Sequence, residues 1–190
     1  MKTFAYSKIY LDQAADNLGD MLDCAVNRFG FNSDDFMNLF IKSGVAKEFS
    51  FGFPRVILGM TGKELCNDVY YKVFGKELSG FQYEDKYVNK TKEYWAGWIL
   101  AKYQWYSCQS FETILTTLQV SDLIKMYSPL HEASEIKTFE LLDNQLIKKG
   151  ISLYHKINAN GNIISLQEYI NPYHFPVSKN IKLNKDDRLR

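Results

Sequence analysis

One of the three histidines in this 190-residue chain lies in a pattern that could bind a metal. The run from His131 to Glu135 reads His-Glu-Ala-Ser-Glu and begins like the helix of a zinc protease, in which two histidines four residues apart bind zinc. Glu135 occupies the second position instead, and no other segment offers a third ligand at a recognisable spacing. Glutamates also suit the first turn of a helix, because they interact favourably with its dipole. We therefore expect a plain helix start and no metal site.

Two other segments resemble binding loops but lack the residues that would bind. Gly59 to Glu64 is similar to a phosphate-binding loop, but Ile57 replaces the leading glycine and the Glu64 carboxylate would repel phosphate. Lys156 to Gln167 has the asparagine and glycine spacing of a calcium-binding EF-hand loop. Its two ends supply no anionic oxygen, and the lysine would place a positive charge near the ion. We expect no cofactor, and a plain tight turn in the second segment.

A row of four aspartates is the strongest candidate for a binding surface. On a helix these residues share one flank, roughly 100° to 180° from the apolar stripe of the same segment. Like charges four residues apart destabilise an isolated helix by about 0.2 to 0.5 kcal/mol per pair. The row is either a solvated face or a docking surface for a basic partner protein. The candidate partner-binding residues are Asp12, Asp16, Asp20 and Asp23.

The run from Tyr94 to Tyr106 must position much of the structure, because it contains all three tryptophans of the chain. At 100° per residue its apolar side chains cover nearly the whole helix, leaving a thin strip at the positions of Gly97, Gln104 and Ser107. Such a helix is surrounded by protein. An aromatic platform that stacks nucleic-acid bases would need interleaved basic residues, and only Lys102 is available. We therefore predict a buried helix with core tryptophans at Trp98 and Trp105.

The remaining patterns predict further helices and one domain. A helix is expected over 7–29, and a capping box of Thr61 and Glu64 begins another that ends before Gly75. Residues 46–53 read as a connector. The fold class predicted is all-α, with a single helical domain over 2–150 around the aromatic helix. An irregular or hairpin-like appendage follows over 151–176, and a flexible basic tail over 177–190. Other helices are expected over 33–44, 110–118, 121–127 and 134–149.

Charge and composition restrict the classes of partner. The net charge is +1, so no overall field attracts nucleic acid or an anionic membrane. No apolar stretch approaches the length of a membrane span, and the first residues lack the apolar region of a signal peptide. Cys24, Cys66 and Cys108 are widely spaced and are expected to be free thiols. These features indicate a cytoplasmic protein without a membrane contact.

Three phrases together resemble a known family. They are LDQAADNLGDMLDCAVN at 11–27, EYWAGWILAKYQWY at 93–106 and MYSPLHEAS at 126–134. They are similar to an uncharacterised bacterial family of small helical proteins, and the likeness covers about 9–146. The resemblance implies the antitoxin-like half of a toxin–antitoxin pair, encoded near ADP-ribosyltransferase-like proteins. Family members often continue into a DNA-binding helix-turn-helix, but this chain shows no such pattern after Gly150, which puts repression of its own operon in doubt.

Three functional hypotheses follow. The first is a non-enzymatic helical interaction module that binds and restrains a partner protein, such as an ADP-ribosyltransferase-like toxin. The second is a small enzyme with a cleft lined by Tyr83, Tyr103, His131 and Glu132, although no histidine is paired by spacing with a nucleophile. The third is a nucleic-acid-associated regulator that uses the basic tail, which is disfavoured because no basic cluster lies on a predicted folded face.

Overall fold

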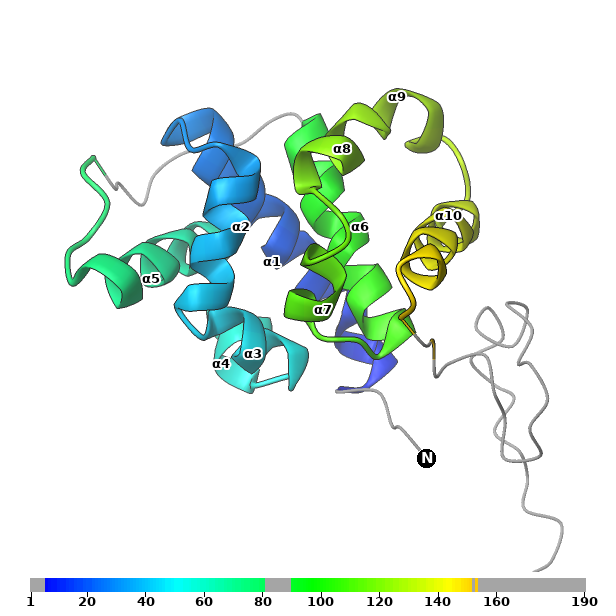
Figure 1. Ribbon diagram of the computed structural model, residues 1–190. Coiled ribbons are helices and arrows are strands. Elements are labelled where there is room, and N and C mark those ends of the chain that lie inside the picture. The colour runs from blue at the N-terminus through cyan, green and yellow to red at the C-terminus, as the bar shows by residue number, and fades with distance from the viewer. Residues whose placement is uncertain (1–5, 81–89, 152, 154–190) are drawn as a thin grey trace, which may run out of the picture. The chain divides into compact units, whose positions relative to one another are not determined.

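The computed structural model describes residues 6–80, 90–151 and 153, and within these ranges it contains ten α-helices and no strand (Figure 1). The predicted all-α class is therefore confirmed. The chain divides into a unit over Met1–His155 and a second one over Lys156–Arg190. The proposed appendage over 151–176, apart from Ile151 and Leu153, and the basic tail over 177–190 lie outside the described residues, as does the segment that resembles an EF-hand.

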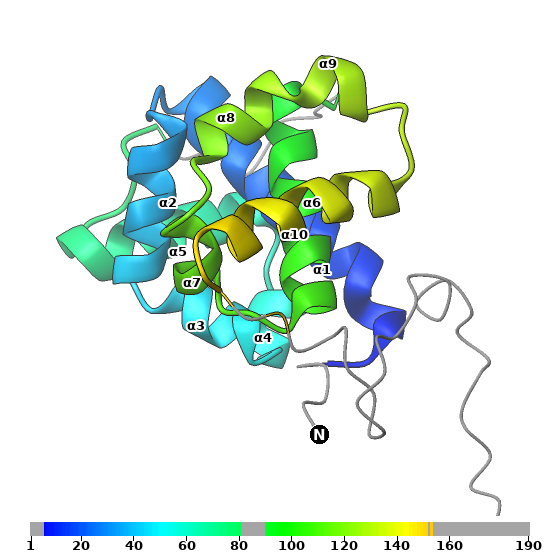
Figure 2. The same cartoon turned by 45° about the vertical axis from the view of Figure 1, so that its right-hand side comes forward.

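The centre of the fold is the pair formed by α1 (Leu11–Asp23) and α6 (Lys92–Ser107), which lie side by side in Figures 1 and 2. Gly19 on α1 and Gly97 on α6 let the two helix backbones approach closely. A Cβ atom on Gly97 would lie 2.5 Å from the carbonyl oxygen of Leu18 and 3.0 Å from the Cα of Gly19. No larger residue fits without moving a helix backbone, so the strip that looked least apolar on α6 lies in close contact with α1 at Gly97.

Helix α5 (Gly62–Phe74) packs on the other side of α1 and is held at its first turn. The predicted capping box is present: Thr61 accepts a hydrogen bond from the Glu64 amide, while the Glu64 carboxylate accepts one from the Thr61 amide at 2.7 Å. From α1, the Asn17 amide nitrogen donates to the carbonyl oxygens of Ile57 at 2.9 Å and Met60 at 3.0 Å. These bonds fix the entry into α5 against α1.

The segment predicted as a connector over 46–53 is mostly helical, which corrects that expectation. Helices α2 (Ser33–Lys42), α3 (Val45–Ser50) and α4 (Pro54–Ile57) follow one another closely. They are short, and their stability comes from packing rather than from length. The rings of Phe40, Phe49 and Phe111 meet edge to face, with centroids 5.2 to 6.3 Å apart.

The C-terminal half of the unit wraps around α6. Its last helix, α10 (Glu135–Lys148), crosses α6 in Figure 2 and contributes Phe139, whose ring stacks on Tyr106 at 4.8 Å. The Tyr103 hydroxyl donates to the buried Asp143 carboxylate at 3.0 Å, and burial together with this carboxylate raises the pKa of Tyr103. The elements of this half are α7 (Phe111–Leu115), α8 (Val120–Lys125), α9 (Tyr127–Leu130) and α10 (Glu135–Lys148).

The prediction of a buried aromatic helix is confirmed for one of the two tryptophans named. Trp105 is 4% exposed, and its indole nitrogen donates to the carbonyl oxygen of Tyr6 at 2.9 Å. Trp98 is only half-buried, because α6 turns this side toward an opening rather than toward the core. Gln104 and Ser107, from the strip expected to be least covered, are fully buried. Within the described residues, no helix combines the length and apolar character needed to cross a membrane.

Candidate functional site

The four aspartates of α1 do not form one solvated face. Asp12 is 86% exposed at its side chain, yet one of its oxygens lies 3.0 Å from the Nζ of Lys102 on α6. Asp16 accepts a hydrogen bond from the Tyr94 hydroxyl at 2.5 Å, and the Nζ of Lys90 lies 3.8 Å from the same carboxylate oxygen. These three contacts tie α1 to α6 or to the residues that lead into it.

Asp23 is the buried member of the row, with only 3% of its surface exposed. Its carboxylate accepts hydrogen bonds from the hydroxyl of Thr91 and, at 2.9 Å, from the amide of Asn27. Thr91 in turn caps α6 by accepting a hydrogen bond from the Tyr94 amide. Asp23 therefore anchors the start of α6 to the end of α1, and its burial speaks against direct contact of this residue with a partner.

Asp20 remains exposed, and no hydrogen bond or ion pair to it is found among the described side chains. Its pKa is raised above the usual value for an aspartate, first by partial burial and then by repulsion from Asp16 and Asp23. The positive charge of Lys90 opposes this shift. The negative charge of the row is therefore not fully neutralised within the described part of the molecule.

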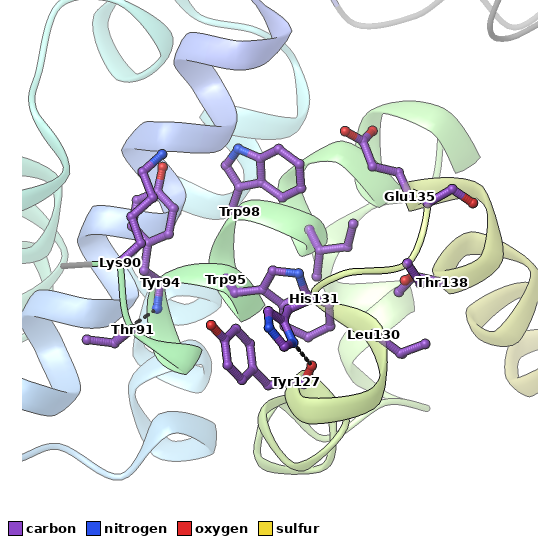
Figure 3. Close-up of a pocket in the computed structure, with 13 residues that line it drawn as sticks. Lys90, Thr91, Tyr94, Trp95, Trp98, Tyr127, Leu130, His131, Glu135 and Thr138 are labelled. Carbon is purple, nitrogen blue, oxygen red and sulfur yellow. Dashed lines mark hydrogen bonds between the residues drawn. The ribbon is translucent and has the colours of Figure 1, made fainter.

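An open pocket of about 500 Å³ lies beside this row, between α6 and the segment formed by α9 and the start of α10 (Figure 3). Trp95 and Trp98 form its α6 wall, and Tyr127 and His131 stand on the opposite wall. We call this site the aromatic pocket. Its further lining residues are Lys90, Thr91, Tyr94, Ile99, Leu130, Ala133, Ser134, Glu135 and Thr138.

The rings of the aromatic pocket hold one another in place. Tyr127 and His131 are stacked, with centroids 4.4 Å apart and planes inclined by 20°. Trp95 meets Tyr127 edge to face at 5.7 Å. The Nδ1 of His131 lies 3.0 Å from the carbonyl oxygen of Tyr127, so the tautomer with a proton on Nδ1 donates to the backbone. The pocket thus presents a preformed set of aromatic surfaces.

Lys102 joins the aromatic pocket to the acidic row. Its side chain is 8% exposed, and its Nζ lies 4.0 Å from the centre of the Trp98 ring. The same Nζ donates to Glu135 at 2.8 Å and pairs with Asp12 at 3.0 Å. Burying an ammonium group costs free energy unless the group is paired. Lys102 is paired with a carboxylate from α1, an indole of α6 and a carboxylate of α10, so its contacts connect these three helices.

The structure supports only part of the cleft expected from the sequence. His131 lines the aromatic pocket, but Glu132 does not, and Glu135 takes its place. Tyr103 is buried beside Asp143 and lies away from the pocket, while Tyr83 lies outside the described residues. From the sequence, Glu135 is expected only to stabilise the start of a helix. Its partner Lys102 is 33 residues distant in the chain, so spacing alone gave no signal.

Among residues 6–80, 90–151 and 153, no group of three or more histidine, cysteine, aspartate or glutamate side chains could hold a metal ion. Cys24, Cys66 and Cys108 are free thiols, as predicted, and the first two are buried. Comparisons of the chain with protein families, curated proteins and solved structures find no match. The site must therefore be interpreted from its own geometry.

Proposed function

We propose that this chain is a non-enzymatic helical interaction module that binds and restrains a partner protein. The observation that carries the proposal is the continuity of the acidic flank of α1 with the aromatic pocket through the contacts of Lys102. The resemblance of three sequence phrases to antitoxin-like proteins supports the same role and names an ADP-ribosyltransferase-like toxin as the class of partner.

The charges at this surface favour a basic partner. Asp12 and Asp20 are exposed on α1, Asp16 is partly exposed, and Glu132 is largely exposed next to the aromatic pocket. Of the two lysines that contact the region, Lys102 is buried and already paired, so Lys90 is the basic side chain that remains largely exposed. An excess of negative charge accelerates encounter with a positively charged protein and makes that rate sensitive to salt.

His131 and Glu135 each use one polar atom of the aromatic pocket for a structural contact, which supports a binding role over catalysis. The Nδ1 of His131 lies within hydrogen-bond distance of two backbone carbonyl oxygens, of Tyr127 and Ser128. One oxygen of Glu135 accepts from Lys102. A general acid or base needs a clear path to the reacting proton. Partly exposed aromatic rings with a polar rim are, in contrast, typical of sites that anchor protein partners.

A growth assay tests the proposed role. The product of the gene adjacent to this chain's own should arrest a bacterial host when produced alone, and coproduction of this chain should restore growth. The two proteins should then elute as one complex in size-exclusion chromatography. Failure of the chain both to bind this product and to restore growth would overturn the proposed function.

Two matched variants locate the interface in that assay. Replacing Asp12, Asp16 and Asp20 with asparagine removes three charges but keeps side chains of the same shape, so the fold should persist while growth is restored less well. The control carries Glu→Gln at three exposed sites far along the chain from the row, Glu77, Glu112 and Glu140. It should restore growth as well as the native chain.

A further inference from the structure

We propose that the aromatic pocket receives an arginine side chain of the partner, with its guanidinium beside Trp98 and its charge facing Glu135. This inference rests on the proposed function and specifies the chemistry of the partner at one site. The chain already holds a cation on these same two residues. Lys102 places its Nζ 4.0 Å from the Trp98 ring centre and 2.8 Å from Oε1 of Glu135.

Trp98 and Glu135 can each still contact a second cation from the side of the pocket. Lys102 does not line the pocket, whereas Trp98 and Glu135 do, so each is shared between the internal lysine and the opening. The Glu135 side chain is 34% exposed, and its contact with Lys102 uses Oε1. Among the described residues, no hydrogen bond or ion pair to its Oε2 is found. That oxygen can accept a hydrogen bond from a second cation.

Figure 3 shows how charge is arranged along the pocket. Glu135 lies at one end and Lys90 at the other, with the ring of Trp98 between them. The Nζ of Lys90 sits 4.6 Å from the Tyr94 ring centre and 3.8 Å from Asp16, so its charge is partly offset there. A cationic side chain that enters from solvent is therefore favoured at the Glu135 end.

The shape and lining of the pocket favour arginine over lysine. A guanidinium is planar and weakly hydrated, and it stacks on aromatic faces while donating two hydrogen bonds to one carboxylate. Half-buried Trp95 and Trp98 and the stacked pair Tyr127 and His131 provide such faces. An ammonium is a compact, strongly hydrated charge that gains less from flat surfaces. The volume of about 500 Å³ holds one such side chain together with neighbouring atoms of its backbone.

Titration of the full-length chain with short peptides tests the inference directly. The probes are acetyl-Ala-Arg-Ala-amide, the same peptide with lysine, and the same peptide with citrulline, which keeps the shape of arginine but carries no charge. The readout is the set of indole N–H signals in a nitrogen–proton NMR spectrum, assigned with Trp95→Phe and Trp98→Phe variants. Trp105 is an internal control, because its indole donates to the Tyr6 carbonyl away from the pocket.

We expect the arginine peptide to shift the Trp95 and Trp98 signals with saturation at millimolar concentrations, and to bind more tightly than the lysine peptide. Citrulline should leave the signals in place. Glu135→Gln should weaken arginine binding about fivefold or more, because it removes the charge that faces the guanidinium. Glu140→Gln, on the same helix but not in the pocket lining, should leave it unchanged.

Because Glu135 also pairs with Lys102, Trp95→Leu provides an independent variant that removes one ring without touching this pair. It should weaken arginine binding while the Trp105 signal stays in place. Equal binding of citrulline and arginine, or no saturable shift of Trp95 and Trp98, would overturn the inference. If the peptides fail but the partner complex still depends on Asp12, Asp16 and Asp20, the arginine site is wrong and the proposed function stands. If arginine binds but no partner is restrained, the proposed function fails.

Discussion

The two sides of α6 are built in opposite ways. Toward α1, Gly97 leaves so little room that a single added carbon would meet the backbone of Leu18 at 2.5 Å. On the opposite side, Trp95 and Trp98 are half-buried and face an open pocket of about 500 Å³. A small residue on one side thus lets two helix backbones meet, whereas two large aromatic residues on the other side stay partly exposed. On these two sides of α6, burial depends on how closely a neighbouring helix backbone approaches and not on the size of the side chain.

The largest effect should come from the packed part of α6. Trp105→Ala removes a ring that is 4% exposed and a hydrogen bond to Tyr6. We expect the free energy of unfolding to fall by about 3 to 5 kcal/mol, measured by urea denaturation. Trp98→Ala should cost clearly less, because this ring already contacts solvent. Equal losses for the two variants would remove the distinction between the two sides of the helix.

Gly97→Ala should be the next most harmful change. Alanine normally stabilises a helix relative to glycine by about 1 kcal/mol. Here the new methyl group would overlap the carbonyl oxygen of Leu18, and overpacking of this kind costs about 1 to 3 kcal/mol. We expect a lower melting temperature, while Asn144→Ala, an exposed control on α10, should leave it nearly unchanged. A melting temperature raised by Gly97→Ala would show that the two helices are not in close contact.

Much of this scaffold could be predicted from local patterns. The capping box of Thr61 and Glu64 was found because both partners lie within four residues of each other. The helical segment over 46–53 was missed, because Gly52 and Pro54 look like breaks although the packing of Phe49 stabilises a short helix there. Local signals therefore found the longer helices and missed those held by tertiary contacts.

The site was less predictable because its contacts join distant parts of the chain. The burial of Asp23 depends on Thr91, 68 residues later, and nothing in the aspartate spacing indicates it. Periodicity correctly placed the aspartates on one flank of α1, but it could not show that α6 lies against that flank. Likewise, an apolar pattern on all sides of α6 does not reveal which side a neighbouring helix leaves open. Lys102, regarded as a lone basic residue, proved to be the connection between row and pocket.

Asp20 should give the smallest effect and the one that depends on pH. Its pKa is raised in the folded state, chiefly by partial burial and by repulsion from Asp16 and Asp23. Because this pKa is higher in the folded than in the unfolded state, the folded protein loses stability as the pH rises from the unfolded-state pKa through the folded-state pKa. Asp20→Asn should therefore raise stability at pH 7 by only a few tenths of a kcal/mol, because solvent screens a group that is only partly buried.

That gain in stability should disappear at acidic pH, below the pKa that Asp20 has in the unfolded state, because the carboxyl group is then protonated in both states. Melting curves of Asp20→Asn and the native chain at pH 7 and at low pH provide the comparison. A variant that is less stable than the native chain at pH 7 would mean that the charge of Asp20 has a favourable partner.

The rate at which the partner associates tests the proposed interface most directly. The association rate constant should be determined by stopped-flow fluorescence, at low and high salt, for the native chain and for the variant with asparagine at Asp12, Asp16 and Asp20. If the acidic flank steers a basic partner, the variant should associate about tenfold or more slowly at low salt, and the difference should shrink as salt is added. Equal association rates at low salt would show that the row serves only to hold α1 against α6, and the proposed interface would be wrong.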